Sequence, residues 1–291
     1  MAFNSQSGDV ATRSTIDSFL RTPPNGVRPA PPELWGFGGL HGGLAIAAMV
    51  DAMAASAEPT GQTGAGAQRL RSVTGRLHRA VREPFSVAAQ TDAATRSTRS
   101  ASARLFPSAD EQPAAQTAPV APLASATSLF GSDSPAPAPA FAPPFPDVPA
   151  WHAGGLFNPP PSFVPVSEFY ELRVTGTNRP FAGGTDPSLT AWVRLTEDDQ
   201  PPGQLRLLFL VDALAPSISA VLDTPQPVPT IELSVQFSGN RAVSPWVLVD
   251  ARTAASGPDG WVTETIQVWG EDRAHLASAT QLRLVRPLPA P

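Results

Sequence analysis

The chain has 291 residues, of which 42% are apolar and 15% charged, a composition that supports a folded core and is compatible with about two domains. Cysteine and lysine are both absent, which excludes disulfides, thiolate nucleophiles, cysteine-bound metals, lysine Schiff bases and a P-loop lysine. The net charge of −5 argues against a nucleic-acid partner or a basic membrane-binding surface.

The N-terminal segment, residues 1–10, is polar and lacks a hydrophobic run, so it does not have the pattern of a signal peptide. No apolar stretch approaches the roughly 18 residues that a membrane span requires. The sequence therefore predicts a soluble, cytoplasmic protein without a membrane span. A weakly marked strand is expected within residues 15–21.

The first half of the chain is predicted to contain one buried helix followed by four strands. Residues 38–55 have the apolar density of a buried helix and begin with small residues. Alternation of apolar and polar residues, with Gly, Pro and Asp between the runs, is typical of antiparallel strands. The predicted strands are LRSVTGRLHRAV (70–81), PFSVAAQTDAA (84–94), RSASARLF (99–106) and LASATSLF (123–130).

Residues 132–165 are rich in proline, which removes a backbone donor and excludes this stretch from helices and sheet interiors. We expect an extended connector with polyproline character, whose tryptophan and phenylalanines hold it along the surface of the fold. A disordered insertion without a role is the alternative. The connector divides the chain into a first domain, residues 1–131, and a second domain, residues 166–291.

The second half repeats this arrangement. Residues 203–222 resemble the first helix in apolar density and also begin beside glycine. The predicted strands are FYELRVTG (169–176) and LTAWVRL (189–195) before the helix, and TIELSVQF (230–237), PWVLVDARTA (245–254), WVTETIQVW (261–269) and LASATQLRLV (276–285) after it.

Three short matches between the halves occur in the same order, which indicates an internal duplication. The matches are VDA at 50–52 and 211–213, Pro84-Phe85 with Pro245-Trp246, and LASAT at 123–127 and 276–280. A long apolar helix and an antiparallel sheet can each bury an apolar face against the other. The sequence therefore predicts an α+β fold of two repeats, each a long central helix wrapped by an antiparallel sheet, joined edge to edge or face to face.

Four segments resemble the double-hotdog acyl-CoA thioesterases of the thioesterase II type. They are FGGLHGGLA (37–45), LVDALAP (210–216), VPTIELSVQF (228–237) and ASATQLRLV (277–285). The resemblance implies a double hotdog that hydrolyses acyl-CoA or acyl-carrier thioesters without a cofactor. It also implies a water nucleophile held by an Asp, a Thr and a Gln, which are here Asp212, Thr230 and Gln281.

Each of these three residues also has a plain structural interpretation. Asp212 lies among apolar residues, where a carboxylate must be hydrogen-bonded, and it can be a satisfied buried group or a general base. Thr230 can be an ordinary strand residue and Gln281 an outward-facing one. The duplication favours function for Gln281, because Ser128 follows the matching LASAT in the first half, whereas Asp51 mirrors Asp212.

Two further groups are candidates for substrate binding. Gly39, His41 and Gly42 lie at the N-terminus of the first predicted helix, whose N-terminal amides can hold an oxyanion, although His41 can equally be a packed or capping residue. Arginines at 69–82 can form a solvated strand face or bind the phosphates of coenzyme A. By strand parity Arg69, Arg71 and Arg79 share one face, and Arg76 and Arg82 the other.

Other chemistries lack their markers in this sequence. The four histidines, His41, His78, His152 and His275, have no metal-ligand spacing, and no GxSxG or GxGxxG motif occurs. The main alternative to a thioesterase is a non-hydrolysing acyl-CoA or acyl-binding accessory protein with the same fold. A thioesterase acting on acyl-carrier protein is a third possibility, and a homo-oligomer is possible.

Overall fold

The computed structural model describes residues 15–23, 26–56, 68–108, 120–134 and 141–287. The polar segment 1–10 and residues 135–140 of the proline-rich connector lie outside the described residues. Within the described part, no helix is long and apolar enough to cross a membrane.

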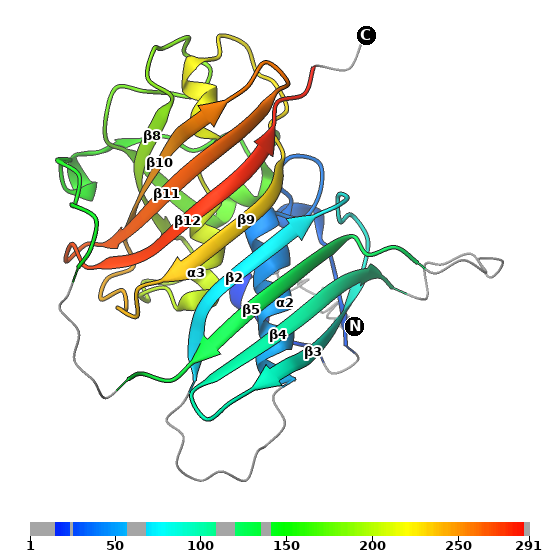
Figure 1. Ribbon diagram of the computed structural model, residues 1–291. Coiled ribbons are helices and arrows are strands. Elements are labelled where there is room, and N and C mark those ends of the chain that lie inside the picture. The colour runs from blue at the N-terminus through cyan, green and yellow to red at the C-terminus, as the bar shows by residue number, and fades with distance from the viewer. Residues whose placement is uncertain (1–14, 24–25, 57–67, 109–119, 135–140, 288–291) are drawn as a thin grey trace, which may run out of the picture.

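The strands form one antiparallel sheet with the order β1-β3-β4-β5-β2-β9-β12-β11-β10-β8-β7-β6, and the helices lie on one side of it (Figure 1). The first half contains α1 (Ile16–Leu20), β1 (Val27–Arg28), α2 (Gly42–Ala55), β2 (Arg69–Leu77), β3 (Phe85–Ala94), β4 (Thr98–Pro107) and β5 (Ala124–Gly131). The second contains β6 (Gly155–Leu156), β7 (Tyr170–Val174), β8 (Ser188–Leu195), α3 (Gln204–Val211), β9 (Thr230–Phe237), β10 (Val247–Ser256), β11 (Trp261–Gly270) and β12 (His275–Leu284). In each half an α-helix is followed by four strands, and the order β3-β4-β5-β2 in the first half corresponds to β10-β11-β12-β9 in the second.

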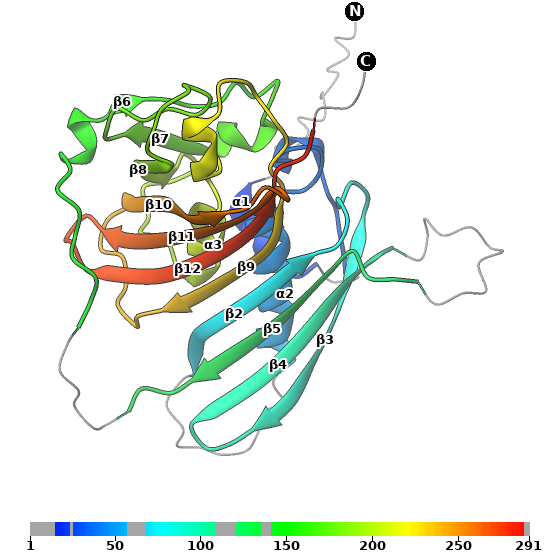
Figure 2. The same cartoon turned by 45° about the horizontal axis from the view of Figure 1, so that its top comes forward.

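The two halves join edge to edge through β2 and β9, which run antiparallel. Val73 pairs with Val235, and the hydroxyls of Thr74 and Ser234 are 2.8 Å apart at the centre of the junction. This pairing covers one edge of each half-sheet and makes the sheet continuous (Figure 2).

Small residues allow helix α2 to approach both α3 and the sheet. A side chain at Gly43 would place its Cβ 2.4 Å from the carbonyl oxygen of Leu208 in α3. A Cβ at Gly75 in β2 would lie 2.5 Å from Cγ1 of Ile46. The N-terminus of α2 is therefore held directly against the C-terminal half of α3, and this contact positions the functional site.

The second helix is shorter than the sequence predicts. Instead of a long helix over 203–222, α3 ends at Val211 with Asp212 as its C-cap, and a 3-10 helix follows at Ser217–Val221. Pro216 explains the break, because proline lacks the amide that a continuing helix needs and disfavours helical geometry before it. Asp212 therefore lies at a helix end, where the dipole disfavours an anion and makes hydrogen-bond donors necessary.

The prediction of a strand within residues 15–21 is also wrong, because Ile16–Leu20 form helix α1. Thr15 caps this helix, and the side chains and backbone of Thr15 and Ser18 form a reciprocal capping box. A five-residue helix has little intrinsic stability, so its position depends on tertiary contacts.

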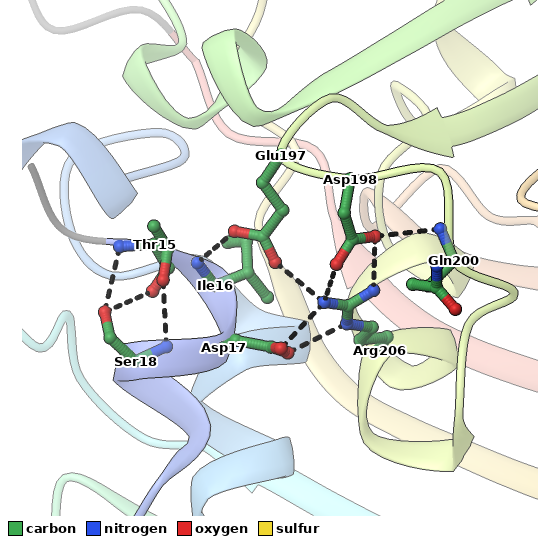
Figure 3. Close-up of polar contacts among 8 residues, drawn as sticks. All are labelled: Thr15, Ile16, Asp17, Ser18, Glu197, Asp198, Gln200 and Arg206. Atoms are coloured by element: carbon green, nitrogen blue, oxygen red, sulfur yellow. Dashed lines mark hydrogen bonds and ion pairs between the residues drawn. The ribbon is translucent and has the colours of Figure 1, made fainter.

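Arg206 of α3 supplies these contacts through a cluster of carboxylates (Figure 3). Its guanidinium bonds Asp17 at 2.9 Å, Asp198 at 2.7 and 2.9 Å, and Glu197 at 3.2 Å. Glu197 also accepts a hydrogen bond of 2.8 Å from the backbone N–H of Ile16. The three carboxylates have the spacing of a metal site, but Arg206 already provides their positive charge.

Phe145, Val148 and Trp151 of the connector pack on the face of the second half-sheet opposite to the α-helices, against Trp192, Trp246 and Trp269. Trp151 stacks on Trp246 with ring centroids 4.9 Å apart, and Phe145 packs edge-on against Trp269. Indole Nε1 of Trp192 donates to the carbonyl oxygen of Pro149 at 2.9 Å. Phe145 and Trp151 therefore hold this part of the connector to the surface, as the sequence predicts, whereas Phe141 is exposed.

Candidate active site

The structure brings Asp212, Thr230 and Gln281 together. Carboxylate oxygen Oδ1 of Asp212 accepts a hydrogen bond from Gln281 Nε2 at 2.6 Å and a longer one from Thr230 Oγ1 at 3.4 Å. The other oxygen, Oδ2, accepts from the backbone N–H of Gly43 at 3.0 Å. The side chain of Asp212 is only 7% exposed, so these donors replace water around a nearly buried carboxylate.

A β-bulge between β9 and β12 aligns the two strand residues. Leu282 pairs with Glu232, but the next residue, Arg283, pairs with Thr230, so the register skips Ile231. Because side chains alternate along a strand, this shift places the side chain of Thr230 on the same face as Arg283. Gln281, two residues before Arg283, also faces this side and is buried.

His41 occupies the N-cap position of α2 beside Asp212, and its side chain makes no capping hydrogen bond to the helix. Its Nε2 is 3.0 Å from the backbone carbonyl oxygen of Asp212, and its ring packs edge-on against Phe209 at 4.9 Å. Burial lowers the pKa of His41, although the negative charge of Asp212 opposes the shift. A neutral His41 therefore donates from Nε2 to the carbonyl, which leaves Nδ1 as an acceptor 3.8 Å from Asp212 Oδ2. Among the described residues Nδ1 has no hydrogen-bond partner.

The lowered pKa of His41 predicts a loss of stability in acid. Below about pH 6.5 the unfolded imidazole takes up a proton that the folded protein resists, so the free energy of unfolding falls with falling pH. His41→Gln keeps a donor for the Asp212 carbonyl and does not titrate. Urea unfolding at about pH 7.5 and about pH 5.5 should therefore show a smaller acid-induced loss in His41→Gln than in wild type. An equal loss in both proteins would contradict this account of His41.

The glycines beside His41 give access to the carboxylate. A Cβ at Gly42 would lie 2.9 Å from Asp212 Oδ2 and 2.8 Å from Leu77 Cδ1, so a side chain there would displace Asp212 or Leu77. Gly39 packs against the backbone of Val81, where a Cβ would lie 3.0 Å from the carbonyl oxygen. Both glycines line the same cavity as Asp212.

This cavity has a volume of about 760 Å³ and mostly apolar walls. The sequence-predicted residues that line it are Gly39, His41, Gly42, Arg79, Asp212 and Thr230. Gln281 does not line the cavity, but its side chain contacts Asp212, which does. The connector forms part of the wall with Phe157, Pro159, Pro160, Phe163 and Val164, and the adjacent strands contribute Tyr170, Leu172 and Leu189.

Sequence analysis did not find Arg283 and Glu264. Arg283 donates from Nη1 to Thr230 Oγ1 at 2.8 Å, from Nη2 to Gln281 Oε1, and from Nε to Glu264 Oε2 at 2.8 Å. The two-residue alternation along β12 was the available signal, because it places Arg283 on the same face as Gln281. Glu264 was also predictable in principle, since it lies opposite Gln281 on β11.

The structure does not bring Arg69, Arg71 and Arg79 together. Arg69 and Arg71 both bind Asp133, at 2.5 and 2.6 Å, whereas Arg79 lines the cavity at the opposite end of β2. Parity fails because β2 ends at Leu77, before Arg79. As a result Arg79 and Arg82, which parity assigned to opposite faces, line the same cavity.

The matching positions in the first half have different surroundings. Asp51 forms an ion pair of 2.6 Å with Arg28 and accepts a hydrogen bond of 2.5 Å from Thr22. Ser128, which matches Gln281, is buried, and among the described residues its hydroxyl has no hydrogen-bond partner. The carboxylate beside the cavity is therefore Asp212, while its counterpart Asp51 is neutralised by an arginine.

Comparison with known proteins identifies the family. Residues 139–285 match the family model described as the acyl-CoA thioesterase C-terminal domain. The match covers half of the chain and includes Asp212, Thr230 and Gln281. The chain therefore belongs to this thioesterase family. A search of curated protein sequences found no match.

Solved structures support the same fold. A conserved protein of unknown function with a hot dog fold from Alicyclobacillus acidocaldarius aligns with a TM-score of 0.77 and 21% identity, covering 94% of this chain and 98% of that one. The acyl-CoA thioesterase II TesB2 from Mycobacterium marinum aligns with a TM-score of 0.65 and 15% identity, covering 95% of this chain and all 100% of the other. A tesB protein from Mycobacterium avium subsp. paratuberculosis has a TM-score of 0.68 and 16% identity, covering 94% and 98%. The chain is similar to these proteins over their whole length and has the hotdog fold.

Proposed function

We propose that the protein hydrolyses acyl thioesters, and that Asp212 is the general base for an attacking water. The observation that supports this most strongly is the placement of Asp212. Its carboxylate lies beside an apolar cavity, next to the N-terminus of α2, and accepts hydrogen bonds from Gln281, Thr230 and Gly43. An apolar cavity with a small number of fixed polar groups is typical of a site for an acyl substrate.

In the proposed reaction, water binds between Asp212 Oδ2 and His41 Nδ1, two acceptors that are 3.8 Å apart. The water oxygen attacks the carbonyl carbon of the thioester while Asp212 takes its proton. The oxyanion of the tetrahedral intermediate is held by the N–H of Gly42 at the start of α2. The intermediate then collapses, the C–S bond breaks, and the proton passes from Asp212 to the departing thiolate. Thr230 and Gln281 keep the carboxylate in place.

The proposal divides the chain as the sequence analysis does. Residues 1–131 form the N-terminal hotdog, 132–165 the connector and 166–291 the C-terminal hotdog with the three proposed catalytic residues. The first hotdog contributes the N-terminus of α2 and His41. The connector contributes aromatic residues to the wall of the cavity.

We further propose that Arg79, Arg82 and Arg286 bind the phosphates of coenzyme A. These three side chains line the cavity and, with His78, are its basic lining residues outside the Asp212 cluster. Arginine binds phosphate through charge-assisted hydrogen bonds. This set replaces Arg69 and Arg71, which are bound to Asp133.

The test compares two thioesters of the same acyl chain, one of coenzyme A and one of N-acetylcysteamine, which lacks phosphates. Replacing each of the three arginines with alanine should lower kcat/KM for the coenzyme A thioester by about tenfold, because a charged hydrogen bond contributes about 1.5 kcal/mol. The N-acetylcysteamine thioester should be unaffected. Arg76→Ala is the matched control, since Arg76 is exposed and lies outside this cavity. Equal losses on both substrates would contradict the phosphate site.

The same assay decides between hydrolysis and binding alone. Release of free thiol from acyl thioesters of several chain lengths supports the hydrolase. A ligand that binds and stays intact would instead identify a non-hydrolysing acyl-binding protein. Hydrolysis of carrier-bound acyl groups without hydrolysis of coenzyme A thioesters would point to acyl-carrier protein as the partner.

A further inference from the structure

We propose that Arg283, held by Glu264, is a positioning residue that fixes the direction of the hydrogen bonds around Asp212. This inference rests on the proposed function and names a part of the site beyond the three proposed catalytic residues. The pair is deeply buried, because Arg283 is 5% exposed and Glu264 is 1% exposed.

The guanidinium of Arg283 has a different acceptor at each of its three nitrogens. Nε donates to Glu264 Oε2 at 2.8 Å, Nη1 to Thr230 Oγ1 at 2.8 Å, and Nη2 to Gln281 Oε1. Glu264 is itself fixed, because its Oε1 accepts the backbone N–H of Ser217 at 2.5 Å. A rigid planar donor held in this way determines which atoms of its neighbours act as acceptors.

The amide of Gln281 can take only one orientation under these conditions. Since Oε1 accepts from Arg283, Nε2 must point to the other side, where it donates to Asp212 Oδ1 at 2.6 Å. The hydroxyl of Thr230 is constrained in the same way. Because its oxygen accepts from Arg283, its hydrogen is directed to Asp212 Oδ1 or to a water beside it. Without Arg283 the amide can flip and the hydroxyl can turn its lone pairs toward the carboxylate.

Glu264 also keeps Arg283 from neutralising the proposed base directly. Nη2 of Arg283 lies 3.6 Å from Asp212 Oδ1, beyond a normal hydrogen bond, while Nε is bound by Glu264. The other titratable groups near Asp212 are uncharged, because burial lowers the pKa of His41 and raises that of Tyr170. Among the described residues, the charged groups that face Asp212 are therefore Arg283 and, bound to it on the far side, Glu264.

The experiment measures kcat, KM and the pH profile of thioester hydrolysis for three variants. Arg283→Met should lower kcat about 10- to 100-fold, the range found when a hydrogen-bond partner of a metal-ligating side chain is removed. It should also move the acidic limb of the profile up by roughly one pH unit, because the carboxylate loses a nearby cation. Glu264→Gln should move the same limb down, because Arg283 is then free to approach Asp212. Arg283→Lys should restore the position of the limb but not kcat, since lysine has the charge without the planar set of donors.

Arg28→Met is the matched control, because Arg28 is also buried and paired with a carboxylate, Asp51, outside the site. The Arg28→Met variant should be less stable, but its folded form should keep the wild-type kcat and the wild-type acidic limb of the pH profile. A purely structural Arg283 would behave like this control. The proposal would be overturned if the acidic limb of the pH profile did not move in Arg283→Met and Glu264→Gln. It would also be overturned if the acidic limb moved in the same direction in both variants. If wild type hydrolyses no thioester, the proposed function fails on its own. In that case the ¹³C NMR titration of the Asp212 carboxyl, assigned with Asp212→Asn, should still shift up in Arg283→Met and down in Glu264→Gln. The absence of these two opposite shifts would overturn the positioning role.

Discussion

Asp212→Asn is expected to lower kcat for thioester hydrolysis by about 10²- to 10⁴-fold, the usual contribution of a general base. The amide cannot take a proton from water, although it fills the same space. KM should change much less, because the apolar walls of the cavity are unchanged. The measurement is the initial rate of thiol release at substrate concentrations on both sides of KM.

A second substitution separates catalysis from folding. In Asp212→Asn, the new NH₂ group faces a donor in either orientation of the amide, Nε2 of Gln281 on one side or the backbone N–H of Gly43 on the other. Two facing donors should cost about 1–3 kcal/mol of stability. The double variant Asp212→Asn/Gln281→Glu gives the amide an acceptor and should recover most of that stability without recovering kcat. Recovery of activity together with stability would show that hydrolysis does not need a carboxylate at position 212.

Arg206→Met is expected to lower the free energy of unfolding by about 3 kcal/mol, because it leaves Asp17, Glu197 and Asp198 without their common cation. Urea unfolding measures the loss. The freed carboxylates have ligand oxygens within 4.8 Å of one another, so millimolar Ca²⁺ should stabilise the variant. Wild type should not respond, since Arg206 already neutralises the cluster.

Arg76→Met is the control for this prediction. Arg76 pairs with Glu232 at 2.7 Å, but its side chain is 60% exposed, and an exposed pair contributes less than about 1 kcal/mol. Equal stability of the Arg206→Met and Arg76→Met variants would contradict the role assigned to the Arg206 cluster.

Much of the sheet was predictable from the sequence, because strands with one buried face have a clear two-residue alternation. The strands at 70–81, 84–94, 99–106 and 123–130 appear as β2, β3, β4 and β5 with small changes at their ends. Asp212, Thr230 and Gln281 came from the resemblance to a family, since none of them is distinctive alone. Their convergence depends on contacts between α3, β9 and β12, which local sequence does not specify.

The features that sequence analysis missed depend on irregular backbone or on long-range contacts. Helix α3 ends before Asp212 because Pro216 interrupts the apolar segment 203–222, whose hydrophobic pattern alone predicts a longer helix. Arg283 faces Thr230 only because of the bulge in β9, and strand alternation by itself does not predict a bulge. Arg79 leaves the face of Arg69 because β2 ends first.

The central claim is that a water held by Asp212 attacks the thioester carbonyl. A single turnover in H₂¹⁸O with enzyme in excess over an acyl-CoA tests it most directly. The account predicts one ¹⁸O atom in the released carboxylic acid, no ¹⁸O in the protein, and no comparable turnover by Asp212→Asn. Incorporation of ¹⁸O into Asp212, or a wild-type protein that leaves the thioester intact, would contradict it.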